Sequence, residues 1–291
     1  MPNYRSHIRL HIQLSLLVMQ MCILPIVSHG QLSIPYGDNA QAGAYITLNG
    51  VPHYYEVYGN GRPMLLIHGN GTATKGWAAQ IDYFSKKYRV YSVDCRGRGK
   101  SDLGPDTLRF DQMALDMAAF IKAMKLDSVD VVGKSDGAII AILMGIHHPA
   151  HLRRIVAFAA NMQPDSTALT PAVLREMSTQ RKEAERMLAV GDKSKNWEVE
   201  RQRYRLDEFQ PHITGDDLAR IHVPVLVLSG DRDAIKTQHT LWIYQHIPRS
   251  NLCILPGATH QVPREHPELF NQMVDGFLSK PFVPDPARLA H

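Results

Sequence analysis

The stretch Gly133-Lys134-Ser135-Asp136-Gly137 places one serine between two glycines, with an apolar run on each side. The run before it has the length and composition of a buried strand, and the small aliphatic run after it is typical of a buried helix. A strand-to-helix turn this tight brings main-chain atoms so close that a Cβ on either glycine would clash. The serine at the apex stands over the N–H groups and partial positive charge of a helix N-terminus. This arrangement is typical of a nucleophile.

A serine hydroxyl is a weak nucleophile at neutral pH and needs an adjacent base, usually a histidine that a carboxylate orients. In an open α/β sheet the reacting groups gather beyond the carboxyl ends of the strands. Asp231 and Asp233 follow one later run of strand length, and His260 follows the next. The order Ser135, then one of these two aspartates, then His260 therefore predicts a catalytic triad. On spacing alone, either aspartate can supply the acid.

The remaining sequence supplies elements that can position these residues. Two β-rich runs flank Asn49-Gly50, the strongest short signal for a hairpin. Beyond them, apolar runs of strand length alternate with segments of helical periodicity. The expected strands are residues 63–69, 89–94, 129–132, 152–160, 223–228 and 252–255, and the expected helices include residues 113–126, 237–247 and 267–278. This alternation predicts an α/β fold with a mostly parallel central sheet, helices on both faces and antiparallel strands at one edge.

Residues 162–221 differ in character, because they are rich in charge and predict helices without a strand. The strand-helix alternation resumes after them, so we interpret them as an inserted helical cap. Apolar residues within the cap could line a substrate pocket or pack the cap onto the core, and both interpretations stay open; they are Met162, Leu174, Met177, Met187, Leu188 and Trp197.

The first 30 residues predict an export signal. Arg5 and Arg9 precede a largely apolar run, and small residues at Ser28-His29-Gly30 suit cleavage before Gln31. Because Pro25 breaks the apolar run, no stable membrane span is expected. An uncleaved anchor and a buried N-terminal helix are the alternatives. The mature domain is then residues 31–291, exported to the periplasm or secreted.

Two cysteines remain in that domain, Cys95 and Cys253. An exported chain with two cysteines raises the question of a disulfide. Each of these cysteines, however, belongs to a separate strand-like region, where buried free thiols are common. We expect both thiols to be free.

Composition excludes several classes of protein. The 291 residues are 44% hydrophobic and 21% charged, as in an ordinary globular protein, with a formal charge of +4. No basic block interleaved with aromatic residues suggests a nucleic-acid partner. His147, His148 and His151 resemble a metal cluster, but Pro149 interrupts any helix carrying them and no carboxylate joins them, so we expect a helix end. Neither a metal nor a cofactor is predicted, and the oligomeric state stays open.

The combined motifs resemble the α/β-hydrolase superfamily, in particular its esterase-like branch with a helical cap. They extend over residues 45–278, nearly the whole mature chain. The matching motifs are His68-Gly69-Asn70-Gly71, Asp94-Cys95-Arg96-Gly97-Arg98-Gly99-Lys100-Ser101, the serine turn, the Gly-Asp-Arg-Asp turn ending at Asp233 and the Gly-Ala-Thr-His loop ending at His260.

The resemblance implies a role for each residue. Ser135 would be the nucleophile and His260 the base. Relatives usually carry the acid at the second aspartate of the turn, so Asp233 is favoured over Asp231, which would form the turn itself. Two backbone N–H groups would hold the oxyanion, one from Asp136 at the start of the helix and one from Asn70. Lys134 receives no role and is expected to be exposed or to extend its ammonium to the surface.

The implied function is hydrolysis of a small-molecule carboxylic ester through an acyl-enzyme intermediate. Serine as the nucleophile argues against the dehalogenase and epoxide-hydrolase branches, which use aspartate. The same triad could instead hydrolyse a carbon–carbon bond or an amide, or catalyse cofactor-free perhydrolysis. A receptor-like protein that retains the fold for ligand capture is the alternative outside enzymology. The sequence does not specify the acyl group.

Overall fold

The computed structural model describes residues 34–284. The predicted export signal lies outside these residues, as does the end of the C-terminal tail. No helix within residues 34–284 is long and apolar enough to span a bilayer.

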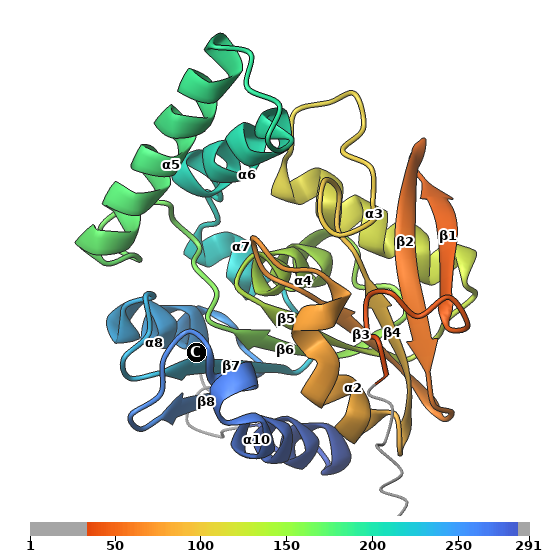
Figure 1. Cartoon of the computed structure of the whole chain (residues 1–291). Helices are drawn as coiled ribbons and strands as arrows, with labels where there is room; N and C mark the ends of the chain where they lie inside the picture. The colour runs from red at the N-terminus through yellow and green to blue at the C-terminus, as the bar shows by residue number, and fades with distance from the viewer. Residues whose placement is uncertain (1–33, 285–291) are drawn as a thin grey trace, which may run out of the picture. The chain divides into compact units, whose positions relative to one another are not determined.

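The described chain contains one eight-stranded sheet with strand order β1-β2-β4-β3-β5-β6-β7-β8 (Figure 1). The pairs β1–β2 and β2–β4 are antiparallel, and every other neighbouring pair is parallel. The sheet is therefore mostly parallel with an antiparallel edge, as predicted. The strands are Gly43–Leu48 (β1), Val51–Tyr58 (β2), Arg62–Ile67 (β3), Tyr88–Val93 (β4), Val129–Lys134 (β5), Leu152–Phe158 (β6), Val225–Gly230 (β7) and Ser250–Leu255 (β8).

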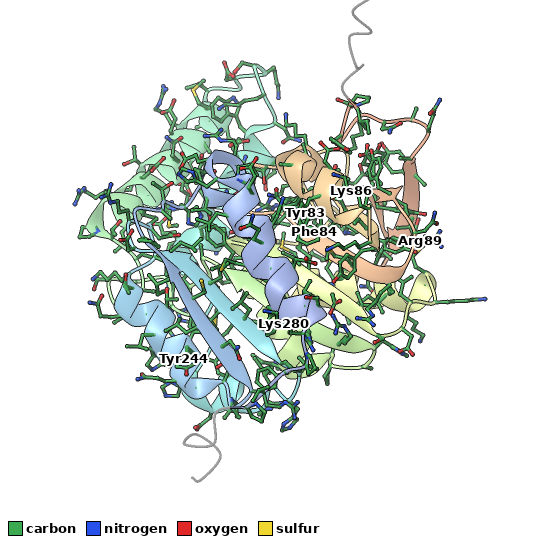
Figure 2. The ribbon with its side chains drawn as sticks, turned by 90° about the horizontal axis from the view of Figure 1, so that it is seen from below. Tyr83, Phe84, Lys86, Arg89, Tyr244 and Lys280 are labelled. Carbon is green, nitrogen blue, oxygen red and sulfur yellow. The ribbon has the colours of Figure 1, made fainter. Side chains whose placement is uncertain are left out.

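Helices cover both faces of the sheet. On one face, α3, α4, α7 and α8 pack into the larger apolar cluster. On the other, η1, α2, α9 and α10 pack into a second cluster, and Figure 2 shows α10 crossing that face up to Lys280. These helices are Thr74–Trp77 (η1), Ala78–Phe84 (α2), Phe110–Ala123 (α3), Asp136–His147 (α4), Gly215–Ala219 (α7), Thr237–His246 (α8), Val262–Glu265 (α9) and Pro267–Ser279 (α10).

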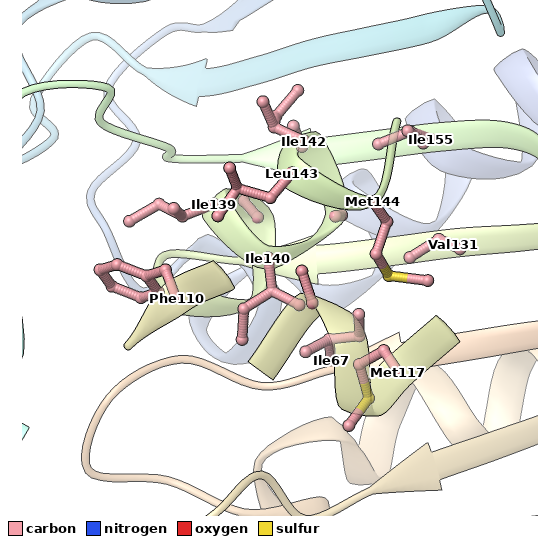
Figure 3. Close-up of a cluster of buried hydrophobic side chains, with 14 of the residues drawn as sticks. Ile67, Phe110, Met117, Val131, Ile139, Ile140, Ile142, Leu143, Met144 and Ile155 are labelled. Carbon is pink, nitrogen blue, oxygen red and sulfur yellow. The ribbon is translucent and has the colours of Figure 1, made fainter. Parts of the chain in front are cut away.

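Helix α4, which follows the serine, is buried around its whole circumference from Asp136 to Ile146. Figure 3 shows its aliphatic side chains between Ile67 and Val131 of the sheet and Phe110 of α3. A helix that is apolar on every side belongs in the centre of a core, and its position is correspondingly fixed. The serine therefore stands on the most enclosed helix of the fold.

Residues 162–221 contain the helices Pro171–Ala189 (α5) and Trp197–Phe209 (α6) as well as α7, and no strand. Helices α5 and α6 pack on each other. They lie beyond the carboxyl ends of the parallel strands, where the serine turn stands (Figure 1). The short helix α7 instead contacts α4 and α8. Within the predicted insertion, only α5 and α6 thus form a layer above the sheet.

Some element boundaries differ from the sequence prediction. Helix α3 begins at Phe110, three residues before the predicted start. Strand β7 extends to Gly230, two residues past the predicted end. The four-residue helix α9 was not predicted, because one turn is too short to show a helical period. Both cysteines are free, as expected.

A buried histidine fixes the start of the inserted segment. Nε2 of His239, in α8, accepts a hydrogen bond of 2.9 Å from the backbone N–H of Met162. The side chain lies in the interior, and burial lowers the pKa of His239 to about 4. The fold therefore holds this histidine neutral, since a protonated Nε2 could not accept the bond.

We predict that His239 makes the fold acid-sensitive. An unfolded histidine binds its proton near pH 6.5, whereas folded His239 resists protonation until about pH 4. Acidification through this window therefore favours the unfolded state, by up to about 3 kcal/mol in the free energy of unfolding. His239→Gln keeps an acceptor for Met162 without a titrating ring, so urea unfolding should show a smaller loss of stability. The exposed-residue control His222→Gln should retain the full loss, and equal losses in wild type and His239→Gln would contradict the prediction.

Candidate active site

Ser135 stands in a sharp turn between β5 and α4 and has φ 54° and ψ −120°. A positive φ is uncommon for a residue with a side chain and is held here by the surrounding packing. A Cβ on Gly133 would lie 2.1 Å from the carbonyl oxygen of Gly137, and one on Gly137 would lie 1.9 Å from that of Ile67. Both glycines are therefore required by close backbone contact, as the sequence predicted.

His260 follows β8 and bonds to the carboxylate that follows β7. Its Nδ1 lies 2.7 Å from Oδ1 of Asp233, whose side chain is fully buried. The same Oδ1 accepts a bond of 2.9 Å from the backbone N–H of Ile235. With Nδ1 bound to the carboxylate, Nε2 is the free nitrogen of the ring.

Asp231 has a different partner. Its Oδ1 accepts a bond of 3.2 Å from the backbone N–H of Ala258. This bond ties the loop after β7 to the loop that carries His260, rather than closing a local turn as expected. The geometry pairs His260 with Asp233 and leaves Asp231 to connect the two loops.

The predicted site residues surround one cavity of about 200 Å³. Ser135 and His260 line it together with Asn70 and Asp136. The inserted helices supply much of the remaining wall: Val173, Glu176 and Met177 from α5, and Tyr204 and Asp207 from α6. Met177 thus lines the cavity, and Met162, Leu174, Met187, Leu188 and Trp197 are absent from its wall.

Two backbone donors at this cavity are unoccupied. Among residues 34–284, neither the N–H of Asn70 nor that of Asp136 donates a hydrogen bond. Asn70 follows β3, and Asp136 begins α4 directly after Ser135. Two residues that line the cavity with Ser135 thus have free N–H groups, the number that an oxyanion hole uses.

Helix α6 holds the side chain of Asn70 at both ends. Nε of Arg203 donates to Oδ1 of Asn70 at 2.6 Å, and Nδ2 of Asn70 donates to the carboxyl of Asp207. The contact of these two α6 residues with Asn70 could not be predicted from the sequence, because they are two charged residues among many in a charged segment. The bonds span more than 130 positions along the chain, and no local pattern records them.

A buried charged pair lies behind the two N–H groups. Nη2 of Arg98 lies 3.3 Å from Oδ2 of Asp136, and both side chains are at least 90% buried. Burial, and next the charge of Asp136, raise the pKa of Asp207 well above its usual range. Asp136 therefore contributes a charge-paired side chain as well as its backbone, whereas the sequence analysis assigned it the backbone alone. Arg98 belongs to the motif at residues 94–101 and was overlooked there.

The other polar residues singled out earlier lie elsewhere. His147 ends α4, and His151 bonds to Asp127 at 2.9 Å. Across the described chain, no cluster of three or more His, Cys, Asp or Glu side chains could hold a metal ion. Lys134 differs from expectation, because it is half-buried and its Nζ donates to Oε1 of Gln261 at 2.9 Å.

The sheet order and the site define an α/β hydrolase, and comparison with known sequences agrees. The profile of the Alpha/beta hydrolase family matches residues 64–273. The protein belongs to the α/β-hydrolase family.

Three similar proteins show how varied the family's substrates are. Human serine hydrolase BPHL is 26% identical over 251 residues, which cover 81% of this chain and 86% of BPHL. A 2-hydroxy-6-oxononadienedioate/2-hydroxy-6-oxononatrienedioate hydrolase of Burkholderia vietnamiensis is 26% identical over 261 residues, 78% of this chain and 91% of that enzyme. The crystal structure of the enol-lactonase from Burkholderia xenovorans LB400 aligns with a TM-score of 0.69 and 21% identity, covering 81% of this chain and all of that one. These similar proteins are named for different substrates, so the family by itself does not specify the substrate of this chain.

Proposed function

We propose that this protein is a serine hydrolase that cleaves small, uncharged carboxylic esters through an acyl-enzyme intermediate. The observation that carries the proposal is the bond between His260 and the buried Asp233, at a cavity that Ser135 also lines. Two unoccupied N–H groups at the same cavity supply the remaining part of an acyl-transfer site.

In the proposed reaction, Nε2 of His260 takes the proton of the Ser135 hydroxyl as its Oγ attacks the ester carbonyl. Asp233 stabilises the resulting imidazolium through Nδ1–H. The N–H groups of Asn70 and Asp136 hold the oxyanion of the tetrahedral intermediate. His260 then protonates the leaving alcohol, and a water molecule activated by His260 hydrolyses the acyl-enzyme to release the acid and free Ser135.

The charge of the cavity favours an uncharged substrate. Its lining includes three acidic side chains, Asp136, Glu176 and Asp207, and neither lysine nor arginine. Asp136 is paired with Arg98, and the raised pKa of Asp207 favours its neutral carboxyl, so a substrate carboxylate would meet the charge of Glu176 and no lysine or arginine in the wall. This composition argues against dicarboxylates of the kind that the Burkholderia vietnamiensis relative is named for.

The size of the cavity favours a short acyl group. About 200 Å³ is less than pockets for drug-sized ligands commonly enclose. Amide hydrolysis, carbon–carbon cleavage of a diketone and perhydrolysis would use the same triad. A panel of uncharged esters, amides and diketones separates these activities. A receptor-like role without turnover would be indicated if a fluorophosphonate probe failed to label the chain.

We predict that Ser135→Ala abolishes hydrolysis of a short p-nitrophenyl ester and labelling by a fluorophosphonate, with the fold intact by circular dichroism. Asp233→Asn should reduce kcat by about 10⁴-fold, because an amide does not hold His260 in the required tautomer. The matched control is Asp231→Asn, which keeps an oxygen for the Ala258 N–H and should stay close to wild type. Wild-type turnover by Ser135→Ala would refute the proposal, and a reversed order of the two aspartate variants would refute the assignment of the acid.

We further propose that helix α6 positions the backbone N–H of Asn70, the proposed oxyanion donor, through its hydrogen bonds to the Asn70 side chain. Asp207→Leu removes the acceptor for Asn70 Nδ2 and should lower kcat about tenfold, a fraction of the loss expected on removing a donor outright. KM should change less than kcat. Asp207→Asn retains an acceptor and should restore most of kcat, whereas a simple packing defect would not be rescued this way.

The control for that series lies next to it on the same helix. Glu208 pairs with Arg181 of α5 and does not line the cavity. Glu208→Gln should therefore leave both kcat and KM near wild type. Equal losses of kcat in Asp207→Leu and Asp207→Asn would show that Asp207 does not act by holding Asn70.

We also propose that the protein is exported, on the basis of the sequence of residues 1–30. Expression of the full chain in a bacterial host followed by fractionation and intact-mass measurement tests this. The expected product is a periplasmic or secreted chain that begins at Gln31. A full-length chain recovered from the cytoplasm would contradict export.

A further inference from the structure

A second cavity, of about 150 Å³, borders the same strand ends as the substrate cavity. Gly69, Lys134 and Gln261 line it. The sequence neighbour of each of these three lines the substrate cavity, and the two cavities share no residue. The strand ends that carry the proposed catalytic residues thus contribute to two separate cavities.

The second cavity is rich in cations. Its lining includes Lys75, Lys134 and Arg264, and it includes no aspartate or glutamate. Its other polar side chains are His68, Thr72, Trp77 and Gln261. His68 is neutral, since its Nε2 accepts the backbone N–H of Cys95 and burial lowers its pKa. The charge of this cavity is therefore the opposite of that of the substrate cavity.

Lys75 and Arg264 are exposed, and Lys134 is half-buried. Lys75, Lys134 and Arg264 form no salt bridge with any residue from 34 to 284. Partial burial lowers the pKa of Lys134. Its ammonium has only the neutral amide oxygen of Gln261 as a side-chain acceptor. Burying part of an ammonium group whose N–H donors are not all bonded costs free energy, and an anion bound to it would offset that cost.

The carboxylates that act electrostatically on Lys134 have other partners. Asp233 binds His260 and the backbone of Ile235. Glu265 accepts the hydroxyl of Thr259 at 2.7 Å. Neither lines the cavity. Neither carboxylate therefore forms a direct ion pair with Lys134 within the described chain.

A buried aromatic side chain belongs to the cavity wall. Trp77 is 1% exposed and lines the cavity, and its Nε1 has no hydrogen-bond acceptor among the described residues. Because this nitrogen is itself inaccessible, the indole of Trp77 serves as a reporter group beside the cavity and not as a donor to a bound ion.

We propose that this second cavity binds a small oxyanion, a carboxylate or a phosphate. The lining offers ammonium and guanidinium donors, which suit an acceptor-only group. The volume is enough for such a group and too small for an extended ligand. The site uses residues outside the proposed triad. A failure of anion binding would therefore not contradict the proposed ester hydrolysis, and the reverse also holds.

The bound anion would lie close to the nucleophile. Gly69 forms part of the wall, and a Cβ built on it would lie 3.7 Å from Oγ of Ser135. This distance is ordinary van der Waals contact, so a single glycine separates the cavity from the serine. The site would therefore hold a free anion from solution close to the serine.

Indole NMR tests the site without any activity assay. The chain has three tryptophans, so ¹⁵N-tryptophan labelling gives a small set of indole signals, and Trp77→Phe identifies that of Trp77. Titration with inorganic phosphate and, separately, with acetate at constant ionic strength should shift the Trp77 signal saturably. Lys134→Gln and Arg264→Gln should each weaken binding about tenfold, the loss expected for one charge-assisted hydrogen bond.

The matched control is Lys86→Gln, an exposed lysine beyond the other end of α2 that Figure 2 labels. It should leave the titration unchanged. Saturation by phosphate alone assigns the site to phosphate, and saturation by acetate assigns it to carboxylates; either supports the proposal. No saturable shift with either anion overturns it, as do shifts that persist unchanged in Arg264→Gln, a surface substitution that does not threaten folding.

Discussion

The structure depends on one close backbone contact, between the start of α4 and the end of β3. No Cβ fits at Gly137, because it would lie 1.9 Å from the carbonyl oxygen of Ile67. This contact holds the serine turn against the strand that leads into Asn70. The proposed nucleophile and the two free N–H groups are therefore placed by main chain rather than by flexible side chains. Such placement costs no reorganisation when charge develops.

The residues in this central arrangement could be predicted because their types and order are tied to strand ends. Ser135 lies between two required glycines, and His260 follows a buried strand, so one sequence pattern marks each. The alternating apolar runs likewise predict the parallel sheet. Local geometry settles the choice that spacing left open, since the carboxyl of Asp233 lies at His260 and that of Asp231 bonds the main chain.

What could not be predicted are contacts between segments far apart in the chain. Arg203 and Asp207 meet Asn70 only because α6 packs above the sheet, and periodicity does not record which charge on a helix faces inward. Lys134 was expected at the surface, but Gln261, 127 positions later, holds its ammonium inside. Each case is a polar side chain whose partner is supplied by tertiary structure.

These contacts also set which charges surround the substrate cavity. The inserted helices bring Glu176 and Asp207 to its wall, while Arg98 pairs with Asp136 and the raised pKa of Asp207 favours a neutral carboxyl. In the proposed reaction, negative charge forming on the substrate would be stabilised by the free N–H groups, with Glu176 as the main opposing charge. The side chains that could not be placed from the sequence thus set the electrostatic surroundings that the proposed ester chemistry would meet.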